Sequence, residues 1–274
     1  MRLNIFSQKG PVIPVVPLSG GIGMSMPLRA GISSNSVESQ LVRAFATKAA
    51  PAVAILVNSP GGSAVQSHLI YKRIRALAEE KKKEVIVAVE DVAAWGGYMI
   101  ALAGDEIVVD RSSIVGSIGV VFAGFGFQKL IEKAGIERRV HTAGEAKVIL
   151  DPFQPEKEED VARLKNLQRE VHASFIDLVK SRRPRLADDA EIFTGAFWSG
   201  ERAVTLGLAD RIGDLHSVLR EKFGDKVELK TIAGEKGFFR RRLGLSARRP
   251  EPAALLDGVI GMIEERLLWN RFGL

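Results

Sequence analysis

The feature that most restricts the fold is an alternation of short, wholly apolar runs with segments of helical periodicity. The apolar runs lie at Val53–Val57, Val85–Val89 and Ile107–Val109, and a further β-rich run lies at Val12–Leu18. A strand that is apolar at every position is buried on both faces, as in a parallel sheet covered by helices. The sequence therefore predicts an α/β fold in which parallel sheet layers are flanked by helices.

Helical segments separate these runs and follow them. Ser36 and Ser63 are placed to act as N-caps, because each precedes a segment with apolar residues at helical spacing. The helix after Ser63 is expected to bury Leu69 together with the apolar residues at 70, 74 and 77. The expected helices cover residues 36–47, 63–79, 93–103, 156–183, 200–206 and 215–223.

Along its 274 residues the chain divides into three parts. Residues 1–232 hold all of the expected strands and form an α/β domain that is long enough to bury a large core. Residues 233–252 form a basic linker. Residues 253–274 form an amphipathic helix with apolar residues along one side.

The positive charge is concentrated in one short segment. The net charge is +6, and residues 231–250 hold six Lys or Arg residues against one Glu, a local balance of +5. Subtracting +5 from +6 leaves about +1 for the rest of the chain, which disfavours a nucleic-acid-binding body. The basic segment and the helix after it suit either contact with an anionic membrane or docking of the helix on a neighbouring subunit.

Composition also excludes several kinds of site. The chain has no cysteine, so a disulfide, a zinc–cysteine site and a thiol nucleophile are impossible. Its four histidines show no metal-ligand spacing, and we expect neither a metal nor a cofactor. No run of 18 apolar residues exists and the N-terminus lacks a continuous apolar region, so we expect no transmembrane segment and no signal peptide. A cytoplasmic location, peripheral to the inner membrane if the basic segment binds lipid, follows from these patterns.

Three short motifs have a composition that suits chemistry. Asn58–Ser63 places two glycines between a buried strand and a helix, where backbone N–H groups can form an oxyanion hole or simply a tight turn. Trp95 is flanked by small residues at the start of a helix, where a nucleophile or a packed aromatic side chain would be presented. Lys147 follows Gly144, and a lysine there is either a base in apolar surroundings or a surface charge.

In this order and at these spacings, the motifs resemble the bacterial signal peptide peptidase A (protease IV) family of serine peptidases. Members of that family use a Ser/Lys dyad on a fold related to the Clp peptidases and crotonases. The resemblance covers roughly residues 12–230. Its motifs are Asn58–Gly62, Ala93–Tyr98, Asp105–Val109, Gly116–Val120 and Gly144–Pro155.

The resemblance implies a role for each matching residue. Lys147, which lies 52 positions after Trp95, would be the general base, and Ser117 would hydrogen-bond the lysine amine. The backbone N–H of Gly61 or Gly62, with that of Gly96, would form the oxyanion hole. The resemblance further implies a peptide or protein substrate and a homo-oligomer in which neighbouring subunits complete a shared cavity.

Trp95 departs from the family pattern at the decisive position. The family sequence reads Ala-Ala-Ser-Gly-Gly-Tyr, whereas this chain has tryptophan in place of the serine nucleophile. An indole donates one hydrogen bond and is not a nucleophile. Loss of a nucleophile that acts as a unit with its base lowers kcat by on the order of 10⁶. We therefore expect an inactive chain, either a natural pseudoenzyme or an active parent with one substitution.

The nearby serines are not obvious substitutes, because each already suits a turn, a cap or a supporting hydrogen bond. They are Ser59, Ser63, Ser112, Ser113 and Ser117. A rival interpretation is a non-catalytic subunit that binds peptides or serves assembly. A crotonase-type acyl-CoA enzyme is disfavoured, because the lysine segment Gly144–Pro155 would have no purpose there.

Overall fold

The computed structural model of the protein describes residues 10–24, 31–144, 146–234 and 266–273. The chain forms two compact units: Met1–Ile118 together with Leu178–Leu274, and Gly119–Asp177 between them in sequence. The predicted basic linker and C-terminal helix lie mainly outside the described residues. Within the predicted C-terminal helix, residues 266–270 are described and are helical. The three-part division predicted from the sequence stays a prediction.

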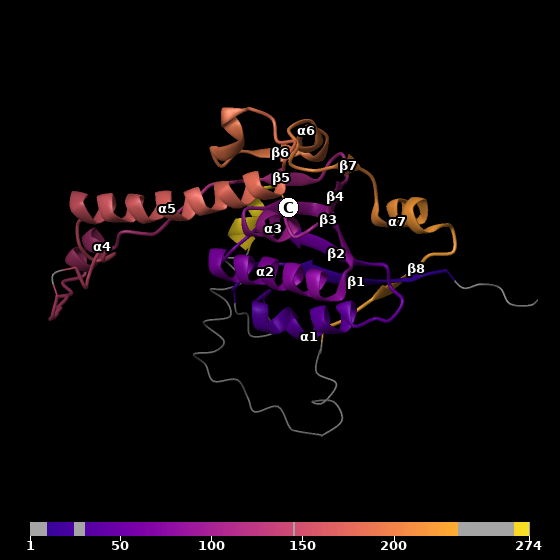
Figure 1. Ribbon diagram of the computed structural model, residues 1–274. Helices are drawn as coiled ribbons and strands as arrows, with labels where there is room; N and C mark the ends of the chain where they lie inside the picture. The colour runs from indigo at the N-terminus through magenta and orange to yellow at the C-terminus, as the bar shows by residue number, and fades with distance from the viewer. Residues whose placement is uncertain (1–9, 25–30, 145, 235–265, 274) are drawn as a thin grey trace, which may run out of the picture. The chain divides into compact units, whose positions relative to one another are not determined.

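The first unit is built on one sheet of eight strands (Figure 1). Its strand order is β6-β5-β3-β2-β1-β8, with β4 beside β3 and β7 beside β4. Every pair is parallel except β5 with β6. The predicted α/β class is thus confirmed as a mixed, mostly parallel sheet flanked by helices. The strands are β1 (Val12–Ser19), β2 (Ala52–Ser59), β3 (Glu84–Ala94), β4 (Glu106–Val109), β5 (Ile114–Gly116), β6 (Phe197–Ser199), β7 (Arg211–Ile212) and β8 (Glu228–Thr231).

Strand β3 is longer than the predicted run and changes its partner halfway. Its first part, Ile86–Val89, pairs with β4, and its last part, Val92–Ala94, pairs with β5 on the same edge. Glu90 and Asp91 lie exposed at the point of change. The extension carries the end of β3 beyond β4 and directly into Trp95.

Helices cover both faces of this sheet. Helices α1 (Ser34–Phe45), α2 (Ala64–Lys81) and α3 (Gly96–Ala101) lie together on one face (Figure 1). Helix α7 (Leu215–Phe223) packs on the other face against alternate residues of β1 to β4. The remaining helices are α4 (Gln128–Lys133), α5 (Glu158–Arg182), the short 3-10 helix Ala190–Phe193 and α6 (Gly200–Thr205).

Helix α1 begins earlier than predicted. Ser33, not Ser36, is its N-cap: the Ser33 hydroxyl accepts from the Ser36 N–H at 3.2 Å, and the Ser36 hydroxyl accepts from the Ser33 N–H at 2.9 Å. This reciprocal capping box satisfies two backbone donors, which explains why the earlier serine wins. The predicted cap of α2 is confirmed, because the Ser63 hydroxyl accepts from the Gln66 N–H at 3.4 Å.

Helix α2 buries a narrower stripe than predicted. Ile70, Ile74 and Leu77 are buried, as their spacing of four and three residues requires. Leu69, which was also expected inside, is exposed. It precedes Ile70 by one residue and is therefore rotated by about 100° away from the buried stripe.

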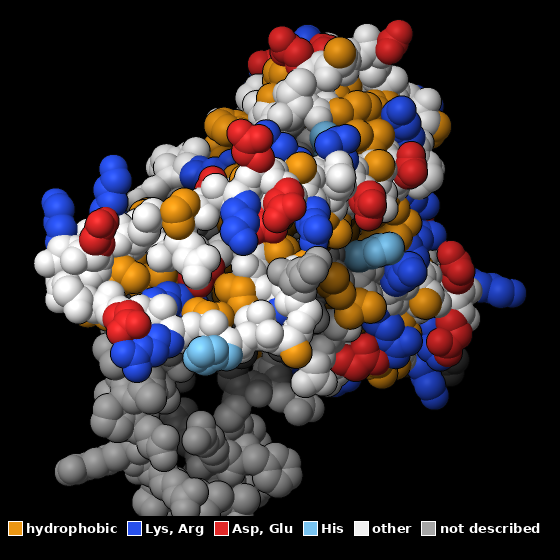
Figure 2. Space-filling view, turned by 90° about the vertical axis from the view of Figure 1, so that its left-hand side faces the viewer, with side chains coloured by type: hydrophobic (Ala, Val, Ile, Leu, Met, Phe, Trp, Pro, Cys, Tyr) orange, Lys and Arg blue, Asp and Glu red, His pale blue; other side chains and the backbone are white. Residues whose placement is uncertain are grey.

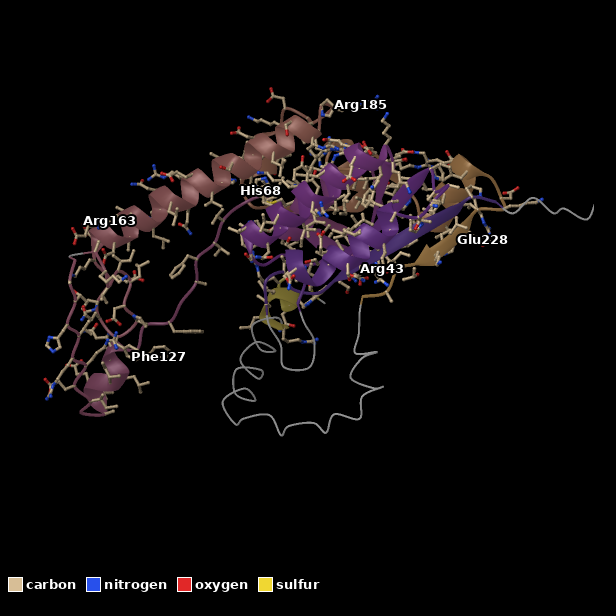
Figure 3. All side chains as sticks on the ribbon, turned by 60° about the horizontal axis from the view of Figure 1, so that its bottom comes forward. Arg43, His68, Phe127, Arg163, Arg185 and Glu228 are labelled. Atoms are coloured by element: carbon tan, nitrogen blue, oxygen red, sulfur yellow. The ribbon has the colours of Figure 1, made fainter. Side chains whose placement is uncertain are left out.

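The second unit, by contrast, has a sparse core. None of the residues of α4 is buried. Phe127 lies at the N-terminal end of α4 (Figure 3). Its ring centroid lies 6.2 Å from that of Phe125 and 5.7 Å from that of Phe153. The Arg138 guanidinium lies over the Phe153 ring and pairs with Asp151 at 2.8 Å. The small aromatic cluster and the ion pair between Arg138 and Asp151 therefore hold this part of the chain together.

Candidate functional site

A sharp turn joins β3 to α3 at Trp95. The backbone of Trp95 has φ 47° and ψ −107°, and its N–H donates to the Gly116 carbonyl at 2.8 Å. A bulky residue with positive φ is an outlier that persists only where its surroundings enforce it. A strand, a strained residue and a helix in succession present that residue's side chain at the end of the sheet, as in a nucleophile elbow.

Two glycines after Trp95 let α3 approach the sheet closely. A Cβ atom at Gly96 would lie 2.3 Å from the Ser67 hydroxyl, and one at Gly97 would lie 2.5 Å from the Ser59 carbonyl oxygen. Neither position has room for a side chain. The predicted glycines therefore serve the close packing of this turn against β2 and α2.

The glycine turn after β2 lies directly against the Trp95 turn. Gly61 and Gly62 have φ values of 107° and 143°, which other residues rarely adopt. A Cβ atom at Gly61 would lie 3.2 Å from the Gly96 nitrogen and 3.0 Å from Cε3 of Trp95. The half-buried indole thus rests on Gly61, beside the Gly96 N–H.

The two glycines of this turn differ in their hydrogen bonds. The Gly61 N–H donates to the Ser59 hydroxyl at 3.2 Å, and that hydroxyl donates to the Gly20 carbonyl at 2.7 Å. The N–H groups of Gly62 and Gly96 donate to no acceptor among the described residues. Backbone donors that point away from their own chain are the groups that can bind a carbonyl oxygen or an oxyanion.

Ser117 follows β5 and is held close to the same turn. Its N–H donates to the Ala196 carbonyl at 2.7 Å, and its φ is 55°. The residue is only 7% exposed, and within the described part of the chain its hydroxyl makes no hydrogen bond. The adjacent Gly116 carbonyl accepts from Trp95, so backbone bonds tie Ser117 to the turn.

Asn58, near the end of β2, forms hydrogen bonds to the part of β3 where that strand changes its partner from β4 to β5. Its side-chain amide donates to the Asp91 carboxylate at 2.7 Å, and its amide oxygen accepts from the Val92 N–H at 3.3 Å. Partial burial raises the pKa of the neighbouring Glu90 carboxyl, and the charge of Asp91 raises it further. Asn58 therefore has a structural role at the start of the glycine motif.

The far end of α3 is held by cationic side chains. Arg182 donates to the carbonyls of Leu102 at 3.0 Å and Gly104 at 2.9 Å, and Arg75 donates to the Ala103 carbonyl at 3.1 Å. Positive groups at a helix C-terminus satisfy its free carbonyls and favour its dipole. These bonds fix the helix whose first residue follows Trp95.

A buried tyrosine anchors the middle of the same helix. The Tyr98 hydroxyl donates to the Leu208 carbonyl at 2.8 Å, and complete burial raises the pKa of this phenol far above its usual range. Tyr98 is therefore a neutral structural donor.

Lys147 belongs to the second unit. It lies exposed after Gly144, whose carbonyl accepts from the Lys147 N–H at 3.2 Å. Glu145 of the same motif lies outside the described residues. The structure thus brings Trp95, Ser117 and the glycines together in the first unit and carries Lys147 on the second.

The remaining serines near the turn are engaged in structural hydrogen bonds. The Ser59 hydroxyl links the Gly61 N–H to the Gly20 carbonyl, and Ser63 caps α2. Ser113 donates to the Glu90 carbonyl at 2.6 Å, while the N–H of Ser112 donates to the Asp110 carboxylate at 2.8 Å. These contacts agree with the turn and cap roles expected from the sequence.

Two residues beside the turn escaped the sequence analysis. Cδ1 of Trp198, on β6, would lie 3.1 Å from a Cβ atom at Gly116, and its indole N–H is buried without an acceptor among the described residues. Ile22 forms isolated bridges to Gly62 and to Ile32. Only strand pairing brings these residues here, and no local motif marks them.

Within the ranges 10–24, 31–144, 146–234 and 266–273, no group of three or more Asp, Glu or His side chains is placed to hold a metal ion. No helix in these ranges is long and apolar enough to cross a membrane.

Known proteins with similar sequences fall into several kinds. A model described as peptidase family S49 matches residues 77–229. The chain is 56% identical over 273 residues to a Na(+)/H(+) antiporter NhaA of Brucella abortus, a match that covers 96% of this chain and 37% of the relative. The chain thus spans little more than a third of that relative's length. It is 31% identical over 231 residues to a putative protease of Synechocystis sp., covering 82% of this chain and 81% of the relative.

A solved structure is also similar. A mutant of the 1510-N membrane-bound stomatin-specific protease has a TM-score of 0.48 and 18% sequence identity. The match covers 82% of this chain and 98% of that chain.

Proposed function

Because the chain belongs to peptidase family S49, we propose that it binds peptides on a serine-peptidase scaffold and that Trp95 prevents their hydrolysis. The observation that carries this proposal is the strained turn at Trp95, where a residue with φ 47° is presented between β3 and α3. Its side chain is an indole, which has no group able to attack a carbonyl carbon. The scaffold and the missing hydroxyl together favour binding without turnover.

The N–H groups of Gly62 and Gly96 are the proposed donors to the carbonyl oxygen of a bound peptide. Their lack of an acceptor among the described residues supports this role. Gly61, which the sequence offered as an alternative, already donates to Ser59. Donors that are preorganised in this way stabilise the charge that develops on the oxygen.

Lys147 is the proposed general base, with Ser117 as its hydrogen-bond partner. A lysine loses its proton near neutral pH only when burial disfavours the charged form. Lys147 is exposed, so this proposal requires a bound peptide or a neighbouring subunit to cover it. The Ser117 hydroxyl makes no hydrogen bond within the described residues, which supports its part in the arrangement.

The indole also opposes hydrolysis by occupying space. It rests on Gly61 beside the Gly96 N–H, where the scissile carbonyl would have to enter. Restoring serine at position 95 therefore both supplies a hydroxyl and removes a bulky ring.

Gain of activity tests the proposal. Turnover of an unstructured casein-like substrate is expected to be absent in the chain as it stands and to appear with Trp95→Ser. Adding Lys147→Ala should abolish the gain, because the nucleophile and its base act as a unit. Lys133→Ala, which removes another exposed lysine of the same unit, is the matched control and should leave the gain intact. Turnover by the Trp95 form that survives Lys147→Ala would refute the dyad.

We further propose that the chain forms a homo-oligomer of four or more subunits. Exposed hydrophobic side chains in the second unit support assembly, because exposed apolar surface favours protein contacts. On the face shown in Figure 2, hydrophobic side chains also lie exposed among charged ones. The exposed residues of the second unit are Val121, Phe122, Phe125, Phe127, Leu130, Ile136, Val140, Ile149 and Leu167. A monomer at micromolar concentration in sedimentation analysis would contradict assembly.

The basic segment that was expected to contact an anionic membrane lies outside the described residues, which end at 234 before resuming at 266. This contact, and the peripheral location that would follow from it, stay predictions. Co-sedimentation with anionic liposomes at low and high salt tests them, because the attraction acts within a Debye length of about 10 Å at 0.1 M salt.

A further inference from the structure

One side of helix α5 carries a cluster of basic residues around a hollow. Gln168, Arg169 and His172 lie three, four and seven residues after Lys165, which places the four side chains on one face of the helix. With Val120 they line a hollow of about 310 Å³. The hollow is therefore bordered by a lysine, an arginine and a histidine.

The two cations have no acidic partner within reach on their own helix. The positions three and four residues before and after Lys165 and Arg169 hold no Asp or Glu. Neither residue forms an ion pair in the part of the chain that the structure describes, where Arg169 donates to the Asn166 amide oxygen at 2.7 Å. Like charges four residues apart destabilise a helix.

The helix dipole does not account for this cluster. It favours acidic residues in the first turn and basic ones in the last, which explains Glu158 and Arg182. Lys165 and Arg169 lie in the middle turns, where the dipole has little effect. A compensating interaction from outside the helix is therefore expected.

A second hollow continues along the same face towards the start of the helix. It has a volume of about 370 Å³ and is lined by Glu156, Glu158, Val161, Ala162 and Lys165. Glu158 precedes Lys165 by seven residues, two helical turns, so the two hollows adjoin at this lysine. Glu156 and Glu158 form no ion pair among the described residues. The face thus changes from acidic to basic across the small side chain of Ala162.

We propose that this face of α5, from Glu158 to His172, together with Glu156 just before the helix, binds the same face of a second copy of the chain in an antiparallel arrangement. Glu158 would then lie opposite Arg169 of the partner subunit, and the two-fold symmetry of such a contact repeats the pair in reverse. The two residues are 11 positions apart, about 16 Å along the helix, so on this face the symmetry axis passes midway between Ala162 and Lys165. The small side chain of Ala162 leaves room for Lys165 of the partner subunit.

The alternation of charge favours a second copy over other partners. A nucleic acid or an anionic membrane would be attracted by Arg169 but repelled by Glu156 and Glu158. The same face of another copy offers both signs in the required order. This contact rests on the proposed homo-oligomer and specifies one of its surfaces.

Charge reversal tests the contact by sedimentation velocity. Lys165→Glu with Arg169→Glu makes the face wholly acidic, and Glu156→Lys with Glu158→Lys makes it wholly basic. Each variant should raise the dissociation constant of its assembly by about a hundredfold, because like charges then oppose each other. Mixing the two variants, or combining all four changes in one chain, should restore assembly.

Arg163→Glu with Glu170→Lys is the matched control. These residues lie on the other side of α5 (Arg163 is labelled in Figure 3), carry opposite charges and leave the net charge unchanged. The control should assemble like the unaltered chain. Mixing the acidic and the basic variant remains informative even if one of them is unstable alone. Only complementary faces can form an assembly that contains both variants.

The outcomes separate this contact from assembly itself. An unaltered chain that sediments as a monomer refutes the homo-oligomer and the contact together. An unaltered chain that assembles, with reversed variants that also assemble, refutes only the α5 contact. Loss in both reversed variants without recovery on mixing refutes the antiparallel pairing.

Discussion

The two units of the chain differ in how far they bury their apolar side chains. In the first unit the sheet is closed on both faces, and residues such as Ile55 and Ile86 are completely buried. In the second unit Phe125 is 78% exposed and α4 buries none of its residues. Close packing within one chain therefore determines the geometry of the Trp95 turn. The second unit, which carries Lys147, has apolar surface left for another molecule to cover.

Truncation of one side chain in each unit tests this contrast most strongly. Ile86→Ala should lower the free energy of unfolding by about 2 to 5 kcal/mol, because it leaves a cavity between the sheet and α7. Phe125→Ala should change it by no more than about 0.5 kcal/mol, since an exposed ring loses few contacts. Urea unfolding at a concentration where the chain is monomeric measures both. Equal losses would contradict the contrast.

A glycine-to-alanine change in each unit, which adds one methyl group, tests how tightly each unit is packed around that position. Gly96→Ala should cost about 1 to 3 kcal/mol of stability, because its Cβ would lie 2.3 Å from the Ser67 hydroxyl. Ser67→Ala in the same chain should recover part of that loss. Gly126→Ala is the matched change in the second unit, where nothing lies within 4 Å of the added Cβ. Thermal unfolding should show a loss only for Gly96→Ala.

A smaller effect of pH is expected in the second unit. The Phe153 N–H, and after it the Arg138 guanidinium, hold the pKa of the Asp151 carboxyl below its usual value. A lowered pKa stabilises the folded form above the unfolded pKa of about 3.9, and this contribution is lost as pH falls through the folded pKa. Protection of the Phe153 amide against hydrogen exchange should therefore fall in acid.

The matched control for this effect is Asp225→Asn, which alters an exposed carboxylate in the other unit. Asp151→Asn should reduce the protection of the Phe153 amide at neutral pH and remove its dependence on acid, whereas Asp225→Asn should change neither. An acid dependence that persists in Asp151→Asn would assign it to another group.

The sequence predicted the central strands because each is apolar throughout. It predicted α5 from the acidic residues at its start and the basic residues at its end. It did not predict β5, β6 and β7, because strands of two or three residues have no measurable pattern. The predicted start of α1 at Ser36 was wrong for a different reason. Ser33, Ser34, Asn35 and Ser36 are all good capping residues, and only the capping box selects Ser33.

Within the candidate site, local motifs were more informative than distant contacts. The turn at Trp95 and the glycines around it follow from short segments of sequence. The neighbouring indole of Trp198 comes from 82 residues beyond Gly116 and reaches it only through pairing of β5 with β6. The exposure of Lys147 also depends on tertiary structure, so its sequence motif alone does not reveal whether the lysine is desolvated.

The backbone of Trp95 has a consequence for the genetic history of the chain. Its positive φ is enforced by the Gly116 carbonyl and by the close fit of Gly96 and Gly97, none of which depends on the indole. Tryptophan is encoded only by TGG, and the serine codon TCG differs from it by a single base. One point mutation can therefore replace the Trp95 indole by a serine hydroxyl while the backbone of the turn keeps its conformation. A population carrying this gene can lose or regain a serine at this position in one mutational step.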